Sequence, residues 1–176
     1  MEEKQSTFEQ LYLPHLDAAY NLARLLIEKD QDAQEVVHEA YLRALKSFKR
    51  SHGKDIRSCI LLMVRNTAYT WLKKHLPDAK LIESDKVIHR VPSAEPASEA
   101  SQGEREKQFH EALTRLPVEY REILFFRDVE SWSYKQLASA LNLPADTAIS
   151  RLSLARRHLW EEVMRVQDRN KSQNGV

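Results

Sequence analysis

The sequence predicts an all-α protein with two small helical domains joined by a flexible linker. Only three of the 176 residues are glycine, and long segments repeat apolar side chains every three or four positions, as amphipathic helices do. This pattern stops at residues 77–104, where three prolines occur among many serine and alanine residues. We therefore expect a first domain of three to four helices at 1–76, a second domain of four helices at 105–166, and a polar, frayed tail at 167–176.

Composition excludes several classes of protein. The net charge is +1, so any contact with nucleic acid has to come from local basic patches. The single cysteine, Cys59, excludes an internal disulfide and a cysteine-rich zinc site. No apolar run approaches the ~18 residues that span a bilayer, and the acidic, polar start MEEKQSTFEQ is unlike a signal peptide. We expect a soluble, cytoplasmic protein without a membrane span, metal or cofactor.

The first predicted helix covers about residues 7–27, on an apolar period that begins at Phe8. Pro14 lies in its interior. Because proline removes a backbone donor and clashes with the preceding turn, we expect a bend or a late helix start there. The second helix is expected to open at Asp30 or Asp32, since acids are favoured in a first turn.

The second helix is acidic near its start and basic near its end. Residues 28–39 hold five acids and one base, whereas residues 43–57 hold six bases and one acid. Acids at a helix start and bases at its end interact favourably with the helix dipole, and each such charge stabilises the helix by ~0.3–1 kcal/mol. The dipole does not explain why the basic run continues past the helix into the loop around Gly53. A third helix at about 55–75 completes the apolar core of this domain.

After the linker, the pattern predicts two helices and then a helix-turn-helix over residues 131–159. The first two span about 109–116, ended by Pro117, and about 120–129. A short helix, a tight turn and a longer helix with a small-polar and basic outer face are typical of a helix-turn-helix. On pattern alone, an ordinary helical hairpin remains the alternative.

Local signals define the two helices of this motif. Ser133, followed three residues later by Gln136, forms a capping box that begins the first helix. Pro144 ends the break at 142–144, because proline cannot continue the preceding helix.

In this order, the blocks resemble the extracytoplasmic-function sigma factors, the smallest group of bacterial sigma subunits. Residues 32–44, DAQEVVHEAYLRA, are similar to the family's acidic-then-apolar core-binding helix. Residues 60–66 stand where the family has a tryptophan-leucine pair leading into arginine-asparagine, although the tryptophan is replaced here. Residues 133–138, SYKQLA, and 146–156, DTAISRLSLAR, resemble the family's S-Y-x-E-I-A and G-T-V-K-S-R-L-x-R-A-R segments.

The resemblance implies a transcription initiation factor that is not an enzyme. Such a factor binds RNA polymerase core through the clamp coiled-coil, directs it to specific promoters and helps to open the duplex. Promoter DNA would be a second partner and an anti-sigma factor, wedged between the two domains, a third. The −10 element would be read as single-stranded DNA with a flipped base, and the −35 element as duplex.

The resemblance also carries over three sets of site residues. The polymerase-binding set is Asp32, Glu35, Val36 and Glu39. The −10 set is Phe48, Lys49, Arg50, Ser51, His52, Lys54, Arg65 and Asn66. The −35 set is Tyr134, Lys135, Thr147, Ser150, Arg151 and Arg156.

Two residues of the helix-turn-helix depart from the family pattern. Ile149 and Leu154 stand where the family usually has lysine and arginine. Each lost phosphate contact should flatten the dependence of binding on salt by roughly 0.9 in the log–log slope. We therefore expect modest −35 affinity, with an unusual sequence preference or a protein partner that covers these apolar side chains.

Two other functions compete with this interpretation. The first is a helix-turn-helix transcription regulator that acts without binding polymerase core, although the acidic helix and basic loop count against it. The second is an enzyme. His38-Glu39 does not complete the zinc-protease pattern H-E-x-x-H, and the sequence has no P-loop. The seven histidines show no paired metal-ligand spacing.

Overall fold

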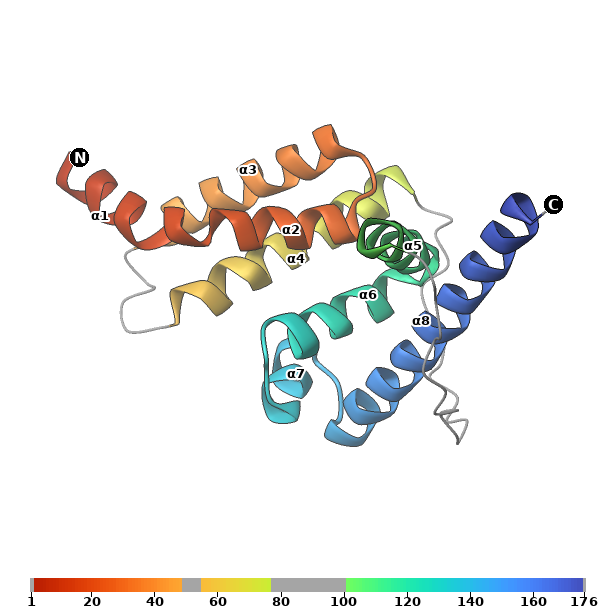
Figure 1. The fold of residues 1–176 in the computed structure, drawn as a ribbon. Helices are drawn as coiled ribbons and strands as arrows, with labels where there is room; N and C mark the ends of the chain where they lie inside the picture. The colour runs from red at the N-terminus through yellow and green to blue at the C-terminus, as the bar shows by residue number, and fades with distance from the viewer. Residues whose placement is uncertain (1, 49–54, 77–100, 176) are drawn as a thin grey trace. The chain divides into compact units, whose positions relative to one another are not determined.

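The protein divides into two compact units, residues 1–79 and 80–176. Its structure is a computed structural model that describes residues 2–48, 55–76 and 101–175 (Figure 1). The elements within these ranges are helices, which confirms the predicted all-α class. Most of the predicted linker lies outside the described residues.

The N-terminal unit is a helical bundle in which α2, α3 and α4 run alongside one another (Figure 1). A short 3-10 turn at Leu13–His15 separates α1 from α2 and holds Pro14 at its start. The bend predicted at Pro14 is therefore confirmed. The helices of this unit are α1 (Glu2–Tyr12), α2 (Leu16–Leu26), α3 (Asp30–Ser47) and α4 (Ile56–His75).

Helix α3 packs against both α2 and α4. Its inner face includes Ala33, Ala40 and Ala44, none of which has any exposed surface. Because alanine projects a single methyl group, these positions let neighbouring backbones approach closely. The valines Val36 and Val37 fill the space between them and are 2% and 6% exposed.

An aromatic cluster closes the core near the end of α3. Phe48 is 5% exposed, and its ring meets those of Phe8 and Tyr12 edge-on at centroid distances of 5.6 and 6.1 Å. The hydroxyl of Tyr41 donates a hydrogen bond to the backbone carbonyl of Tyr12 at 3.0 Å, and burial raises the pKa of Tyr41 to about 12. The expected DNA contact of Phe48 is therefore wrong, since its side chain is part of the core.

In the C-terminal unit, α5, α6 and α7 all pack on the long helix α8. A capping box formed by Ser101 and Glu104 begins α5, so the predicted linker extends slightly too far. A π-helical segment at Phe125–Val129 continues α6. The α-helices are α5 (Gln102–Arg115), α6 (Val118–Leu124), α7 (Tyr134–Ala140) and α8 (Ala145–Asn174).

The predicted frayed tail at 167–176 is wrong, because α8 continues to Asn174. Val166 is fully buried, and one turn later a guanidinium nitrogen of Arg169 lies 2.5 Å from a carboxylate oxygen of Glu111 on α5. Arg169, as the main cause, and Arg115 hold the pKa of Glu111 below its ordinary value. Contacts with α5 thus extend the ordered helix beyond its apolar pattern.

Within the described ranges, no helix has both the length and the apolar character that crossing a bilayer requires. The same ranges contain no group of three or more His, Cys, Asp or Glu side chains placed to hold a metal ion. Cys59 is a half-buried free thiol on α4.

The buried position of Phe48 predicts a large effect on stability. We expect Phe48→Ala to lower the free energy of unfolding by about 3–5 kcal/mol, because it leaves a cavity among aromatic rings. Urea denaturation followed by circular dichroism measures this. Leu42→Ala on the exposed side of α3 is the control and should change stability by less than about 0.5 kcal/mol. Wild-type stability in Phe48→Ala would contradict the core assignment.

Candidate functional site

Two of the predicted polymerase-binding carboxylates line a groove between α3 and α4. The groove has a volume of about 840 Å³. Helix α3 contributes Glu35 and Glu39 to it, and α4 contributes Thr70, Trp71 and His75 from the opposite side. Both carboxylates are exposed, and two bases, Arg43 on α3 and Lys74 on α4, line the same groove.

The four predicted polymerase-binding residues differ in depth. Glu35 and Glu39 are exposed and Asp32 is half-buried. Glu39 accepts a hydrogen bond from the guanidinium of Arg43 at 2.7 Å, one turn further along the helix. Val36 borders the groove but is only 2% exposed. Its side chain lies mostly in the core beneath the groove, and its role as a contact residue stays a prediction.

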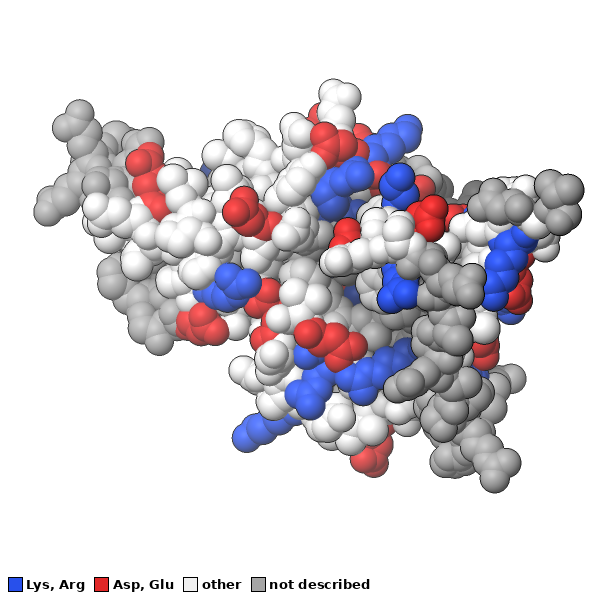
Figure 2. Space-filling model, in the orientation of Figure 1, with Lys and Arg blue, Asp and Glu red and all other residues white. Residues whose placement is uncertain are grey.

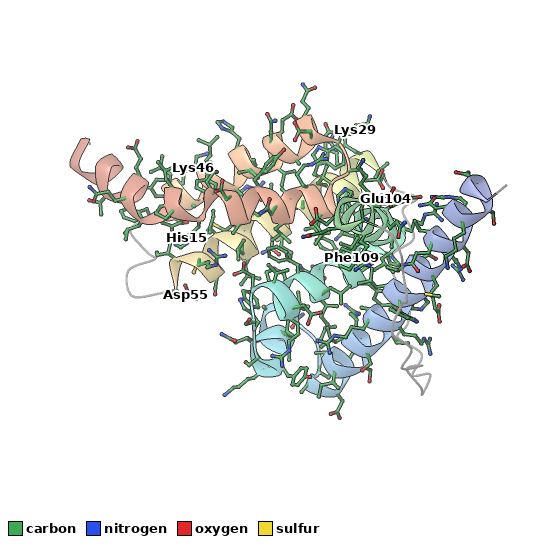
Figure 3. The ribbon with its side chains drawn as sticks, viewed as in Figure 1. His15, Lys29, Lys46, Asp55, Glu104 and Phe109 are labelled. Carbon is green, nitrogen blue, oxygen red and sulfur yellow. The ribbon has the colours of Figure 1, made fainter. Side chains whose placement is uncertain are left out.

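The start of α3 is held by a local polar network. Figure 3 labels Lys29 just before the helix and Lys46 in its last turn. Asp30, the first helical residue, accepts hydrogen bonds from the hydroxyl of Tyr20 and, at 2.8 Å, from the side-chain amide of Gln34. These contacts fix the acidic end of the helix against α2.

The α4 wall of the groove was not predicted from the sequence. The rings of Trp71 and His75 stack with centroids 4.2 Å apart, and the Nδ1 atom of His75 lies 2.9 Å from the backbone carbonyl of Trp71. The two residues are four positions apart, so they share one helix face. That spacing is the signal the sequence offers for the pair, although Trp71 also continues the apolar period of α4 and is half-buried.

The predicted −10 residues are only partly visible. Those at positions 49–52 and 54 lie outside the described residues. Arg65 and Asn66 lie on α4, where an Nη1 atom of Arg65 donates to the side-chain oxygen of Asn66 at 3.3 Å. The guanidinium of Arg65 also covers the ring of Tyr69, 4.4 Å from its centroid. The structure therefore brings Arg65 and Asn66 together on one partly exposed surface.

The helix-turn-helix is confirmed in its local geometry. The Ser133 hydroxyl accepts from the Gln136 backbone N–H at 3.1 Å, and the Gln136 side chain accepts from the Ser133 N–H at 2.8 Å. Asn142 has a φ of 54°, a left-handed conformation that asparagine tolerates better than most residues. The chain then turns at Pro144 into α8.

The predicted −35 residues are placed along α7 and the start of α8. Lys135 is exposed, while Thr147, Ser150 and Arg151 are half-buried. Tyr134 is 39% exposed. Arg127, in the π-helical segment, places its guanidinium over the ring of Tyr134, 4.6 Å from the ring centroid.

Arg156 is exposed but engaged by an acidic residue. Its Nη2 atom lies 2.5 Å from one carboxylate oxygen of Asp128, and its Nε atom lies 3.5 Å from the other. This hydrogen bonding raises the pKa of Arg156 above its ordinary value. Sequence reasoning missed Asp128, because it is 28 positions away in the chain. The carboxylate competes with any phosphate for this guanidinium.

The two apolar departures from the family pattern differ. Ile149 is 43% exposed, whereas Leu154 is only 5% exposed. Of the two expected alternatives, an unusual sequence preference or a covering protein partner, the second does not hold for Leu154, because its side chain is already buried. On the face in view in Figure 2, acidic and basic side chains are interspersed over the described C-terminal unit and do not form one positive area.

Comparison with known proteins matches both units. Residues 11–76 match the family model described as Sigma-70 region 2, and residues 106–159 match Sigma-70, region 4. The chain is 26% identical over 171 residues to the RNA polymerase sigma-H factor of Pseudomonas aeruginosa, covering 85% of this chain and 82% of that protein. It is 23% identical over 172 residues to the ECF RNA polymerase sigma factor SigX of Bacillus subtilis, covering 91% and 89%.

A solved structure shares the fold. The sigma factor RpoE from Bartonella quintana, crystallised with the anti-sigma factor NepR, aligns with a TM-score of 0.69 and 24% identity. The alignment covers 90% of this chain and 97% of that chain.

Asp55, which caps α4 just after the −10 segment, predicts a pH dependence of stability. Its carboxylate accepts from the Ser58 hydroxyl at 2.6 Å and from the Arg57 backbone N–H at 3.1 Å. The Ser58 hydrogen bond is the main cause that lowers the pKa of Asp55. A carboxyl with a lowered folded-state pKa stabilises fully above its unfolded pKa of about 3.9, and this stabilisation is lost as pH falls through the folded value.

Asp55→Asn keeps a capping oxygen but cannot ionise. We therefore expect the stability advantage of the wild type over this variant to shrink as pH falls below about 4, measured by urea unfolding between neutral and acid pH. Ser58→Ala should reduce the pH-dependent part of the difference. A difference that stays constant with pH would contradict the capping assignment.

Proposed function

Because this chain belongs to the sigma-70 family, in its extracytoplasmic-function group, we propose that it binds RNA polymerase core and directs it to promoters read at a −10 and a −35 element. Members of this family are transcription initiation factors and not enzymes, which removes the enzyme alternative. The region 2 match also disfavours a regulator that acts without polymerase.

The observation that carries the proposal is the groove between α3 and α4, onto which α3 presents the exposed carboxylates of Glu35 and Glu39. A groove of about 840 Å³ between two helices has room for side chains of a third helix. Glu35 and Glu39 are its carboxylates, and a basic partner would pair with them. Arg43 and Lys74 also line the groove, and Arg43 is bonded to Glu39, so Glu35 is the carboxylate on which the proposed attraction mainly rests. The basic coiled-coil of the polymerase clamp, expected as partner from the family resemblance, has this complementary charge.

The helix-turn-helix supports the proposed reading of duplex DNA. Helix α8 begins after Pro144 without a side-chain hydrogen bond that caps its first turn. The first N–H groups of a helix lack intrahelical partners and are favourable donors to phosphate. Ser150 and Arg151 follow on the same helix, at the end that enters the major groove in this class of motif.

An anti-sigma factor is part of the proposal. The Bartonella quintana sigma factor was solved in complex with one. A protein that covers Glu35 and Glu39 in this chain would compete directly with polymerase core, because both partners need the same groove.

The carboxylates at the start of α3 predict a charge-dependent loss of polymerase binding. We expect Asp32→Lys combined with Glu35→Lys to reduce binding to purified core at least tenfold, because attraction becomes repulsion. Pull-down and fluorescence anisotropy measure it. The control combines Glu9→Lys with Glu106→Lys, two exposed carboxylates outside α3, and changes net charge equally.

This control should bind core as the wild type does. Undiminished co-purification of core with the α3 variant would overturn the assignment of α3 as the polymerase-binding helix. Circular dichroism establishes that both double variants are folded.

The ion pair between Asp128 and Arg156 predicts a gain of DNA binding. In Asp128→Asn the guanidinium is released for a phosphate, so we expect tighter binding to the −35 duplex. The log–log slope against salt should become steeper by about 0.9. Stability should change by less than about 1 kcal/mol, since the pair is exposed.

A double-mutant cycle identifies the cause of this gain. In an Arg156→Ala background, Asp128→Asn should bring a much smaller increase in affinity. If the increase is as large in that background as in the wild type, the carboxylate acts on DNA directly and not through the guanidinium.

A further inference from the structure

Ile149 interrupts a polar face at the start of α8. It is 43% exposed, while its neighbour Ala148 is fully buried. Three further residues on this helix are exposed: Asp146, Ser153 and Arg156. Asp146 lies three positions before Ile149, Ser153 lies four positions after it, and Arg156 follows Ser153 by three. These spacings place the four side chains along one side of the helix. An exposed isoleucine therefore lies among polar groups on the outer side of the proposed recognition helix.

The chemistry of isoleucine limits what it can recognise. Its side chain has no hydrogen-bonding group, so it cannot read the donors and acceptors of base edges or bind a phosphate. The apolar group that base pairs present in the major groove is the C5-methyl group of thymine. We propose that Ile149 reads a thymine methyl group in the −35 element. The proposal rests on the proposed function, because it requires α8 to enter the major groove.

The surroundings of Ile149 favour DNA over a protein as the occupant. Ser153, one turn further along the same side of the helix, is exposed and small, so it allows close approach to base edges. Protein-docking faces are instead made of several apolar side chains together. Within the described part of α8, the other exposed large apolar side chain is Met164, 36% exposed and in the second half of the helix.

The consequence is a preference that depends on one methyl group. Contact with thymine would remove exposed apolar surface of Ile149 from water, which is favourable. Uracil offers the same hydrogen-bonding edge without the methyl group, so a deoxyuridine substitution isolates this contact from all polar ones.

The experiment begins with the full chain bound to RNA polymerase core. Duplexes randomised over the −35 region are selected for binding, and each enriched thymine is then replaced singly by deoxyuridine. At one position we expect the affinity of the wild type to fall about fourfold, the effect of losing one buried methyl-sized group. Ile149→Ala should bind the thymine and deoxyuridine duplexes equally.

Met164→Ala is the matched control, because it also removes an exposed apolar side chain from α8. It should keep the full discrimination between thymine and deoxyuridine. Ile149→Val, which keeps a branched apolar side chain, should retain part of it.

Two results would overturn the proposal: equal binding of thymine and deoxyuridine by the wild type at every enriched position, or wild-type discrimination by Ile149→Ala. Either result leaves the proposed function standing, since the selection itself has succeeded. Failure to enrich any duplex overturns the proposed function and, with it, the role of Ile149.

Discussion

The close packing of α3 against α2 and α4 is the constraint on which the N-terminal unit depends. Ala33, Ala40 and Ala44 have no exposed surface, so a larger side chain at any of them would force the helices apart. The same helix forms one wall of the groove and carries Glu35 and Glu39 there. The small alanine side chains let the backbone of α3 lie close to those of α2 and α4, and this spacing determines the shape of the groove. Core packing and the proposed polymerase surface are two faces of one helix.

In the C-terminal unit, α8 combines recognition and scaffold in one continuous helix. Its first turns follow the tight break after α7, and its later turns are anchored to α5 through Arg169 and Glu111. The π-helical segment adds a second support, because Arg127 donates to the backbone carbonyl of Trp132 at 2.6 Å and so holds the approach to α7. A long helix anchored at both ends presents its outer face with little freedom to tilt. This rigidity suits contacts that have to match base edges.

The order of the helices could be predicted because its signals are local. Pro14 marks the bend, and Ser133 with Gln136 marks the start of α7. Depth within the fold could not be predicted in the same way. The family resemblance places three residues at positions that contact polymerase or DNA, yet the structure buries their side chains. These residues are Val36, Phe48 and Leu154.

The long-range ion pairs could not be predicted from the sequence for a related reason. Asp128 and Arg156 are 28 positions apart, and Glu111 and Arg169 are 58 apart. No periodicity connects such residues, because their meeting depends on how α5 and the π-helical segment lie against α8.

These pairs also limit the number of cations that α8 can offer to DNA phosphates. Arg156 is held by Asp128, and Arg157 lies 3.7 Å from Glu161. Since phosphate neutralisation supplies most non-specific affinity for DNA, a helix with engaged cations binds duplex weakly when alone. Attachment to polymerase raises its effective concentration at the promoter, so the proposed function needs only modest affinity. Under the proposed function, uncharged contacts such as the one proposed for Ile149 would contribute to the sequence preference, and we expect the chain without polymerase to bind promoter DNA weakly.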